Sequence, residues 1–386
     1  TSYKHFLENE WTVTAGASVS SDKNDIGFQT NSIDTKETAA HAKLKVKKNF
    51  SSRFQLNFGA EHFITDYTED FLAPDGFTFD SGYTDNLTAG FAEADIFFSN
   101  KFAMKLGVRG EYSNALEDFN VSPRISLAYK SSENGQFSLA YGDFYQNPTN
   151  EYLKYDLTLD FEKTSHYILN YQYLANGKTF RAEGYYKDYN SLTKYDTQFP
   201  QFPQFDSDFN NLGSGYATGL DIFWRDNKSI KNLDYWASYS FLDTERDYRN
   251  FREKATPNFA PKHNFSLVTK YFIEDWKSQV GMSYTFASGR PYDNPNTADF
   301  LAEKTKPFNS ISVNWAYLLS QQKILYFSIS NVAGFRNVNG YQYADAPNTN
   351  GIFDRREIRP TADAFFFVGF FWTISADKSS NQLDNL

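Results

Sequence analysis

Apolar and polar residues alternate one by one along many segments of this chain, each about ten residues or longer. Near the C-terminal end, every second residue from Ala364 to Ile374 is apolar, whereas the residues between them turn polar toward the end of the segment. Successive side chains of a β-strand point to opposite faces, so such a segment has one apolar face. The same period of two recurs in segments that begin at Trp11, Phe54, Phe102, Phe180, Tyr235, Val280 and Ile311. No segment has a convincing helical period, and the pattern predicts an all-β fold.

The connections between these segments also alternate, in length. Short turns are expected near residues 49–52, 100–101, 131–135, 175–178, 226–232, 274–275 and 320–322. Between them lie longer polar connections near residues 20–38, 65–83, 113–121, 146–161, 190–214, 244–260, 288–306 and 334–361. A strand on each side of every connection gives about sixteen antiparallel strands. Both chain ends are then expected on the side of the short turns.

Composition excludes several classes of protein. Aromatic residues make up 19% of the chain although its mean hydropathy is −0.60, an unusual combination for a soluble domain. No apolar run approaches the ~18–20 residues of a transmembrane helix. The chain has no cysteine, which excludes a disulfide scaffold or a thiol nucleophile, and its net charge of −9 gives no support for nucleic-acid binding.

Strand length and turn asymmetry favour a transmembrane antiparallel β-barrel. Sandwich strands have ~5–6 residues, whereas a strand that crosses a bilayer needs ~9–11. Short turns on one side, long loops on the other and aromatic residues near strand ends are typical of barrels in the outer membrane of Gram-negative bacteria. Charged residues at alternating positions would then face a wet lumen, where they line a solute path, contact a plug or pair with each other: Lys43, Lys45, Lys47, Lys105, Arg109, Glu111, Arg181, Glu183 and Lys187.

Three groups of segments carry a family resemblance. They are residues 122–130 with 137–148, residues 261–267 with 288–292, and residues 329–341 with 356–360. In this order and spacing, over about residues 90–375, they resemble the barrel of TonB-dependent outer-membrane receptors. That family implies a barrel of about twenty-two strands with an N-terminal plug domain in the lumen. It also implies a segment before the plug that contacts a TonB-type energy-coupling protein.

Neither a plug nor a coupling segment is recognised in this sequence, so part of a barrel is expected. Residues 1–376 would form its C-terminal portion, with roughly six strands of the family's barrel lacking. The strand that pairs with the last one would then lie before Thr1. Residues 377–386 would form a polar tail, which is similar to receptors of the Bacteroidota type.

The resemblance implies active uptake of a scarce small solute, most often a ferric chelate (siderophore), otherwise a cobalamin, an oligosaccharide or a peptide. Three alternatives stay open: a passive porin, a structural or adhesive barrel within a surface complex, and a soluble β-protein. A plug domain encoded upstream would exclude the porin. Intact uptake after gene deletion would favour the structural or adhesive barrel, and extraction without detergent would favour the soluble β-protein. No catalytic constellation, metal site or cofactor motif is found, so an enzyme is not predicted.

One long connection contains an aromatic repeat. Residues 198–205 read Gln-Phe-Pro-Gln-Phe-Pro-Gln-Phe, in which proline favours extended backbone and outward display of the rings. Tyr195, Phe199, Phe202 and Phe205 are therefore predicted as ligand-binding residues in a loop. The alternative is that these rings pack on neighbouring loops. The acidic residues of 66–85 are predicted to lie in a solvated loop rather than to bind a cation.

Overall fold

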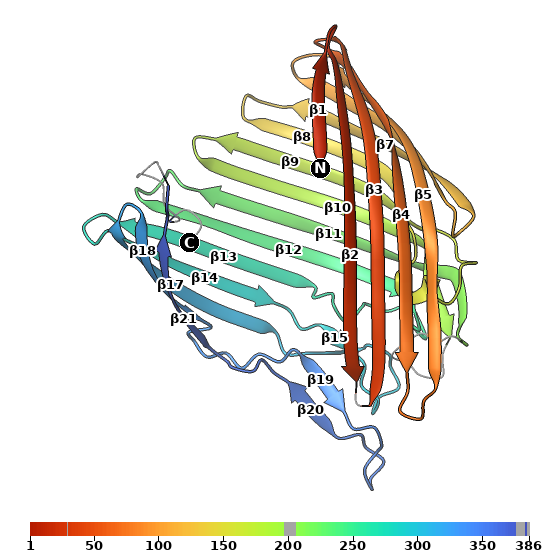
Figure 1. The fold of residues 1–386 in the computed structure, drawn as a ribbon. Coiled ribbons are helices and arrows are strands. Elements are labelled where there is room, and N and C mark those ends of the chain that lie inside the picture. Colours follow the sequence, from red (N-terminus) through yellow and green to blue (C-terminus); the bar gives the residue numbers. More distant parts are fainter. Residues whose placement is uncertain (29, 197–205, 376–382, 384–386) are drawn as a thin grey trace.

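The computed structural model describes residues 1–28, 30–196, 206–375 and 383. The described chain forms a 17-stranded sheet and two small two-stranded sheets. Each strand of the large sheet pairs antiparallel with the strands that precede and follow it, from β1–β2 through to β18–β21 (Figure 1). No helix in the described part is long and apolar enough to cross a membrane.

The strands of the first half are β1 (Ser2–Leu7), β2 (Trp11–Phe28), β3 (Asn31–Ser51), β4 (Phe54–Leu72), β5 (Thr78–Phe97), β6 (Phe102–Ser113), β7 (Asp118–Lys130), β8 (Gly135–Gln146) and β9 (Glu162–Ala175). Those of the second half are β10 (Lys178–Asp196), β11 (Asp208–Asp226), β12 (Leu233–Asp247), β13 (His263–Ile273), β14 (Ser278–Ala287), β17 (Phe308–Ser320), β18 (Lys323–Ser330) and β21 (Phe365–Trp372). Between them lie α1 (Asn150–Leu153) and two small hairpins, β15 (Pro291–Tyr292) with β16 (Glu303–Lys304) and β19 (Gly340–Tyr343) with β20 (Arg355–Ile358).

The strands from β2 onward match the sixteen that the alternation predicts, and β1 is an addition. β1 turns into β2 through residues 8–10, where Asn9 and Glu10 have φ of 57° and 62°. Residues 8–10 contain no glycine or proline, so neither of the usual chain-breaking residues marks this turn in the sequence. The N-terminus therefore lies beside the middle of β2, with the Thr1 amino group 2.8 Å from the Ala17 carbonyl oxygen. The expectation that both chain ends lie at the short turns is wrong for this end. β21, in contrast, ends beside the turn before Lys323.

Two of the predicted long connections are mostly strand. The β2–β3 ladder runs up to the pair Phe28–Asn31, and the β4–β5 ladder up to Leu72–Thr78. Antiparallel pairing needs only backbone donors and acceptors, so a segment polar on both faces can continue a ladder into water. The acidic residues expected in a loop between β4 and β5 therefore lie largely on strands.

Four of these carboxylates stand in one row across four strands. Asp25 of β2 lies opposite Asp34 of β3, which lies opposite Asp70 of β4, which lies opposite Asp80 of β5. Residues directly opposite each other on one face have Cβ atoms about 5 Å apart. Like charges are therefore brought together at this end of the sheet.

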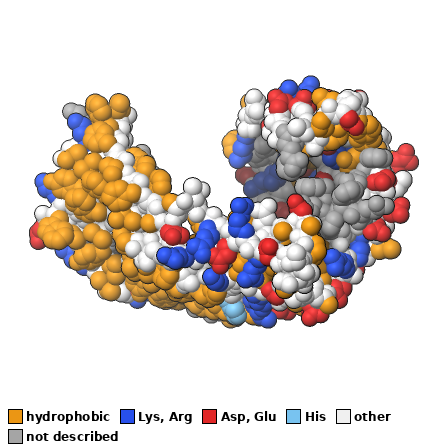
Figure 2. All heavy atoms as spheres, turned by 90° about the horizontal axis from the view of Figure 1, so that it is seen from below, with side chains coloured by type: hydrophobic (Ala, Val, Ile, Leu, Met, Phe, Trp, Pro, Cys, Tyr) orange, Lys and Arg blue, Asp and Glu red, His pale blue; other side chains and the backbone are white. Residues whose placement is uncertain are grey.

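The register separates an apolar face from a polar one, as the alternation predicts. One row across β2 to β7 contains only apolar residues, Val13, Val46, Phe58, Ala92, Val108 and Pro123. The row beside it contains Thr14, Lys45, Gly59, Phe91, Arg109 and Ser122. Figure 2 shows hydrophobic side chains gathered on the convex outside of the curved sheet and charged ones along its hollow. An apolar convex face is what contact with lipid requires.

The last strand follows the same rule. Phe366 and Val368 lie opposite Ile329 and Phe327 of β18 on the apolar face, and these two residues are 68% and 54% exposed. The predicted outward face of this strand is therefore confirmed by the register.

The curved sheet is open in the described part of the chain. β1 pairs with β2, and β21 pairs with β18, but no ladder joins β1 to β21 among the described residues. The result is a trough whose two edge strands stand apart (Figures 1 and 2). That a further strand lies before Thr1 stays a prediction.

Candidate functional site

The connection between β8 and β9, residues 147–161 and here called the strap, crosses the concave face at the loop end of the trough. The Asn150 amide donates to Glu37 of β3 and accepts from the Tyr83 hydroxyl of β5, both at 2.6 Å. Lys154 forms an ion pair with Glu69 of β4 at 2.5 Å. The strap therefore spans the concave side of the curved sheet, passing over β6 and β7 to reach β3, β4 and β5.

A small hydrophobic core fixes the strap. Its buried members are Leu116, Tyr152, Leu153, Leu159, Phe161 and Tyr195. The rings of Tyr152 and Tyr195 lie 5.7 Å apart, and Phe209 packs 6.2 Å from Tyr152. Burial raises the pKa of Tyr152, so its hydroxyl stays neutral. Such satellite clusters commonly form beneath long loops.

Only one of the four predicted ligand-binding residues lies in the described part. Tyr195 is the penultimate residue of β10, is 7% exposed and packs between Tyr152 and Phe209. This packing agrees with the alternative that rings of this connection pack on neighbouring loops. Phe199, Phe202 and Phe205 lie outside the described residues. Ligand binding by the four residues therefore stays a prediction.

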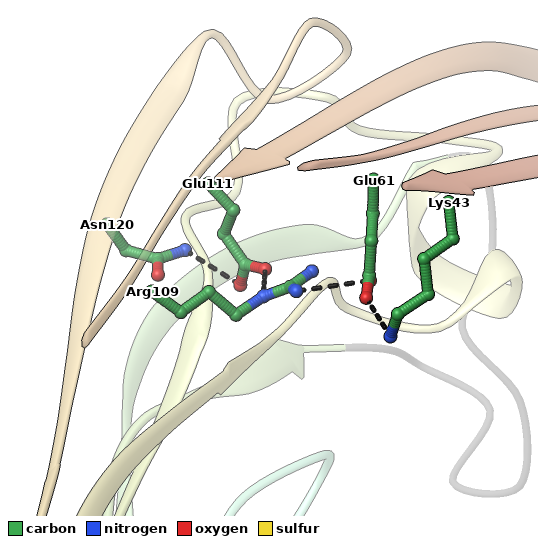
Figure 3. Close-up of polar contacts among 5 residues, drawn as sticks. All are labelled: Lys43, Glu61, Arg109, Glu111 and Asn120. Carbon is green, nitrogen blue, oxygen red and sulfur yellow. Dashed lines mark hydrogen bonds and ion pairs between the residues drawn. The ribbon is translucent and has the colours of Figure 1, made fainter. Parts of the chain in front are cut away.

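Five polar residues form a network on the concave wall (Figure 3). Lys43 pairs with Glu61, and the Arg109 guanidinium bonds Glu61 at 3.1 Å and Glu111 at 2.8 Å. The Asn120 amide donates to the other oxygen of Glu111 at 3.2 Å. The network therefore joins β3, β4, β6 and β7, and one arginine lies between two carboxylates.

The row that carries this network explains its geometry. Lys43, Glu61, Ala89, Glu111 and Asn120 lie opposite one another in succession on β3 to β7. Ala89 of β5 separates the two glutamates, and its methyl side chain leaves room for the guanidinium that reaches across it from the next row. Because Glu61 and Glu111 are only 7% and 6% exposed, the shared guanidinium offsets the repulsion between two poorly solvated carboxylates.

The predicted lumenal charges are on the concave face, and most pair across strands. Lys105 contacts Glu93 at 2.9 Å and Asp95 at 3.2 Å, and Arg181 donates to Gln172 at 3.1 Å. The exceptions on β3 are Lys45 and Lys47, whose ammonium groups have no ion pair or hydrogen bond within the described part of the chain. Sequence reasoning missed Glu61 and Asn120, which alternation would have placed on the polar face but whose partners depend on the register.

The concave face offers hydrogen bonds, charges and aromatic rings. In the part of the chain that the structure describes, no three His, Cys, Asp or Glu side chains are grouped to hold a metal ion. The arrangement can bind and orient a solute or a second protein body.

Comparison with protein families gives one match. Residues 1–332 match the model of the family described as TonB dependent receptor-like, beta-barrel. No curated protein matches the sequence.

Several solved structures share the fold at low sequence identity. The ferric-catecholate import receptor Fiu from Escherichia coli K12 aligns with a TM-score of 0.72 and 11% identity, over 96% of this chain and 63% of that chain. The siderophore receptor PiuA from Acinetobacter baumannii aligns with a TM-score of 0.71 and 14% identity, over 96% of this chain and 63% of that chain. For the ferric yersiniabactin uptake receptor FyuA from Yersinia pestis, the TM-score is 0.70 and the identity 12%, over 96% of this chain and 59% of that chain. The chain thus spans less than two thirds of the length of these receptors.

Proposed function

The chain belongs to the TonB dependent receptor-like β-barrel family, and from this we propose that it acts in active uptake of a scarce solute across the outer membrane of a Gram-negative bacterium. One observation carries the proposal: the family match covers residues 1–332, and the same residues form a curved sheet with an apolar convex face and a polar hollow. The family consists of transport receptors, and uptake rather than catalysis is proposed.

The proposed solute is a ferric chelate. Fiu, PiuA and FyuA, which share the fold, are named for ferric-catecholate import, siderophore reception and ferric yersiniabactin uptake. The strap and the loops beside it lie at the end of the trough where a ligand from outside would arrive. The aromatic connection with Tyr195, Phe199, Phe202 and Phe205 is retained here as a proposed contact for that ligand.

Two protein partners are proposed with this function. The first is a plug body in the trough, for which Lys45 and Lys47 provide cations without a partner of their own in the described chain. The second is a TonB-type energy-coupling protein, which would act on that plug. Outer-membrane lipid covers the convex face.

Uptake of iron tests the proposal. The gene is deleted, and growth on a panel of ferric chelates is measured under iron starvation, together with accumulation of radioactive iron. Loss of growth and accumulation on at least one chelate, restored by the intact gene, is expected. Since active transport needs energy, an uncoupler of the proton gradient should also abolish accumulation.

The other interpretations give different results in the same assay. Accumulation that persists with the uncoupler and depends only on the external concentration would indicate a passive porin. Unchanged accumulation on every chelate, with loss of attachment or of a surface complex, would indicate a structural or adhesive barrel. Either result would overturn the proposal.

A further inference from the structure

A cleft of about 310 Å³ lies on the concave face between the strap and the loop ends of β8 to β12. Its walls include Tyr152 of the strap, Tyr189 and Thr193 of β10, and Arg246 and Arg249 at the end of β12 and beyond it. It is distinct from the network of Figure 3, whose residues lie on β3 to β7.

Two arginines of the cleft lack the close carboxylate contact that most concave-face cations have. Neither Arg246 nor Arg249 forms an ion pair within the described residues. Their guanidinium groups are held by rings instead: Arg246 lies 4.3 Å from the Tyr189 ring centre, and Arg249 lies 5.3 Å from that of Tyr248. Stacking on a ring holds the plane of a guanidinium while its N–H edge stays free to donate.

Two buried polar atoms at the cleft also lack a partner. The Thr193 hydroxyl, on a residue that is 1% exposed, and the Arg246 Nε form no hydrogen bond in the structure. Buried polar groups are nearly always satisfied, so an unpaired hydroxyl and N–H beside the same cleft indicate a missing acceptor. Glu162, the carboxylate on the cleft wall, accepts the Thr193 backbone N–H and the Gln146 amide, both at 2.9 Å, but no hydrogen bond joins it to the Thr193 hydroxyl or the Arg246 Nε.

The backbone around the cleft is held in an uncommon geometry. The β10–β11 register shifts between Tyr189 and Leu192 and again before Lys194, and bulges of this kind redirect side chains. Arg249 has a φ of 55°, which is strained for a residue with a side chain. Its N–H donates to the Thr193 carbonyl oxygen at 2.7 Å, and its own carbonyl oxygen accepts from Tyr195 at 3.0 Å. Thr193 and Arg249 are thus tied to each other before any ligand arrives.

We propose that this cleft binds an oxyanion, the carboxylate or phosphate group of a ligand, through the guanidinium edges of Arg246 and Arg249 and the Thr193 hydroxyl. Planar donor forks match the paired oxygens of such a group, and charge-assisted hydrogen bonds are the strong ones. The cleft walls carry two cations and one carboxylate, Glu162, while Glu151 of the strap interacts electrostatically with Arg249 from outside the lining. If the proposed uptake holds, an anionic chelate would meet the barrel wall here, and to that extent the site rests on the proposed function.

Binding of small probes to the protein purified in detergent tests the site without any transport step. The probes are tricarballylate, inorganic phosphate and the uncharged triamide of tricarballylate, and ligand-observed NMR measures each dissociation constant. Arg246→Gln and Arg249→Gln are each expected to weaken binding of the charged probes about tenfold or more, because a hydrogen bond to a charged group is lost. Thr193→Val should weaken it less, and the triamide should not bind.

Arg124→Gln is the matched control. Arg124 also faces the hollow, lies 4.5 Å from the Phe144 ring centre and forms no ion pair in the described residues, but it is outside this cleft. Its replacement should change the dissociation constant less than twofold. Arg246→Lys keeps the charge and serves as a second variant if Arg246→Gln does not give the heat-modifiable band of a folded barrel. If the folded Arg246→Lys variant loses binding, recognition depends on the planar guanidinium donors of Arg246 and not on its charge alone.

Three results would overturn the proposed site: no binding of either charged probe by the wild type, unchanged binding in both cleft variants, or equal weakening in Arg124→Gln. The preferred probe distinguishes a carboxylate ligand from a phosphate ligand. The outcome is separable from that of the proposed function. Probe binding without chelate uptake would refute the uptake alone, whereas uptake with unaltered probe binding in the variants would refute the cleft alone.

Discussion

Asp34 of β3 lies directly opposite Asp70 of β4, and Asp70 in turn lies opposite Asp80 of β5. Like charges placed opposite each other on one face of a sheet destabilise the pairing. Replacing Asp70 by Asn should therefore stabilise the loop end of the sheet by about 0.2–1 kcal/mol and raise the temperature at which the barrel band is lost on a heat-modifiability gel.

Asp66→Asn is the control for this prediction. Asp66 lies opposite Thr38 and Thr84, and its carboxylate accepts the Thr84 hydroxyl at 2.8 Å, so its replacement relieves no repulsion. The gain from Asp70→Asn should also shrink in 1 M salt, since exposed charges are screened there. An Asp70→Asn variant that melts at a lower temperature would contradict the repulsion.

Arg109 is expected to be the critical member of the concave network. Arg109→Gln leaves Glu61 and Glu111 without their shared cation, at a cost of about 1.5–3 kcal/mol for lost hydrogen bonds to charged groups. Urea unfolding followed by tryptophan fluorescence measures the change. Arg181→Gln, which removes only a bond to the neutral Gln172, should cost much less. Equal costs for the two variants would show that Arg109 has no special role.

A cavity made in the small hydrophobic core under the strap should release the strap from the concave face. Leu153 is 1% exposed, and Leu153→Ala should cost ~2–5 kcal/mol of local stability. Limited proteolysis should then cut within residues 147–161 while the sheet stays resistant. Leu157→Ala, at a position that is 41% exposed, is the matched control and should leave cleavage unchanged. Cleavage of the sheet itself at the same rate would indicate global unfolding instead.

Asp226 should stabilise the turn after β11 in a pH-dependent way. The Ser229 side chain and the backbone N–H groups of Ser229 and Lys228 donate to its carboxylate and lower its pKa to about 2. Because the folded-state pKa is below the ordinary value of 3.8, the contribution is present above about pH 4 and is lost as pH falls toward 2.

Carboxyl carbon NMR should therefore give an apparent pKa near 2 for Asp226, and Asp226→Asn should remove this part of the acid dependence of stability. An apparent value near 4 would contradict the hydrogen-bonded turn.

Alternation alone predicted which side chains share a face, and that part of the fold follows from the backbone geometry of strands. Arg109 and Phe366 are examples, on the polar and the apolar face respectively. What alternation cannot supply is register, because it repeats every two residues and is unchanged by a shift of two. The row in which Ala89 separates Glu61 from Glu111 therefore emerged only from the structure.

The concave sites depended on tertiary contacts even more strongly. Arg246 and Thr193 are far apart in the chain, and the positive φ of Arg249 has no marker in the sequence. The aromatic repeat was visible, but the packing of Tyr195 against Tyr152 required the strap to fold inward. Loop length, in turn, was overestimated because polar segments of β2 to β5 still pair as strands.

The strap also bears on the order of folding. Every ladder of the large sheet joins strands that follow one another in the chain, so the sheet can grow by adding one hairpin at a time. The hydrogen bond between Asn150 and Glu37, in contrast, spans 113 residues and cannot form on a flat sheet. Such a distant contact forms late, after the entropy of closing the intervening loop has been overcome. The strap can therefore bond to β3 only after the sheet has curved enough to bring Asn150 within reach of Glu37. Its docking reports that the native curvature of the sheet has been reached.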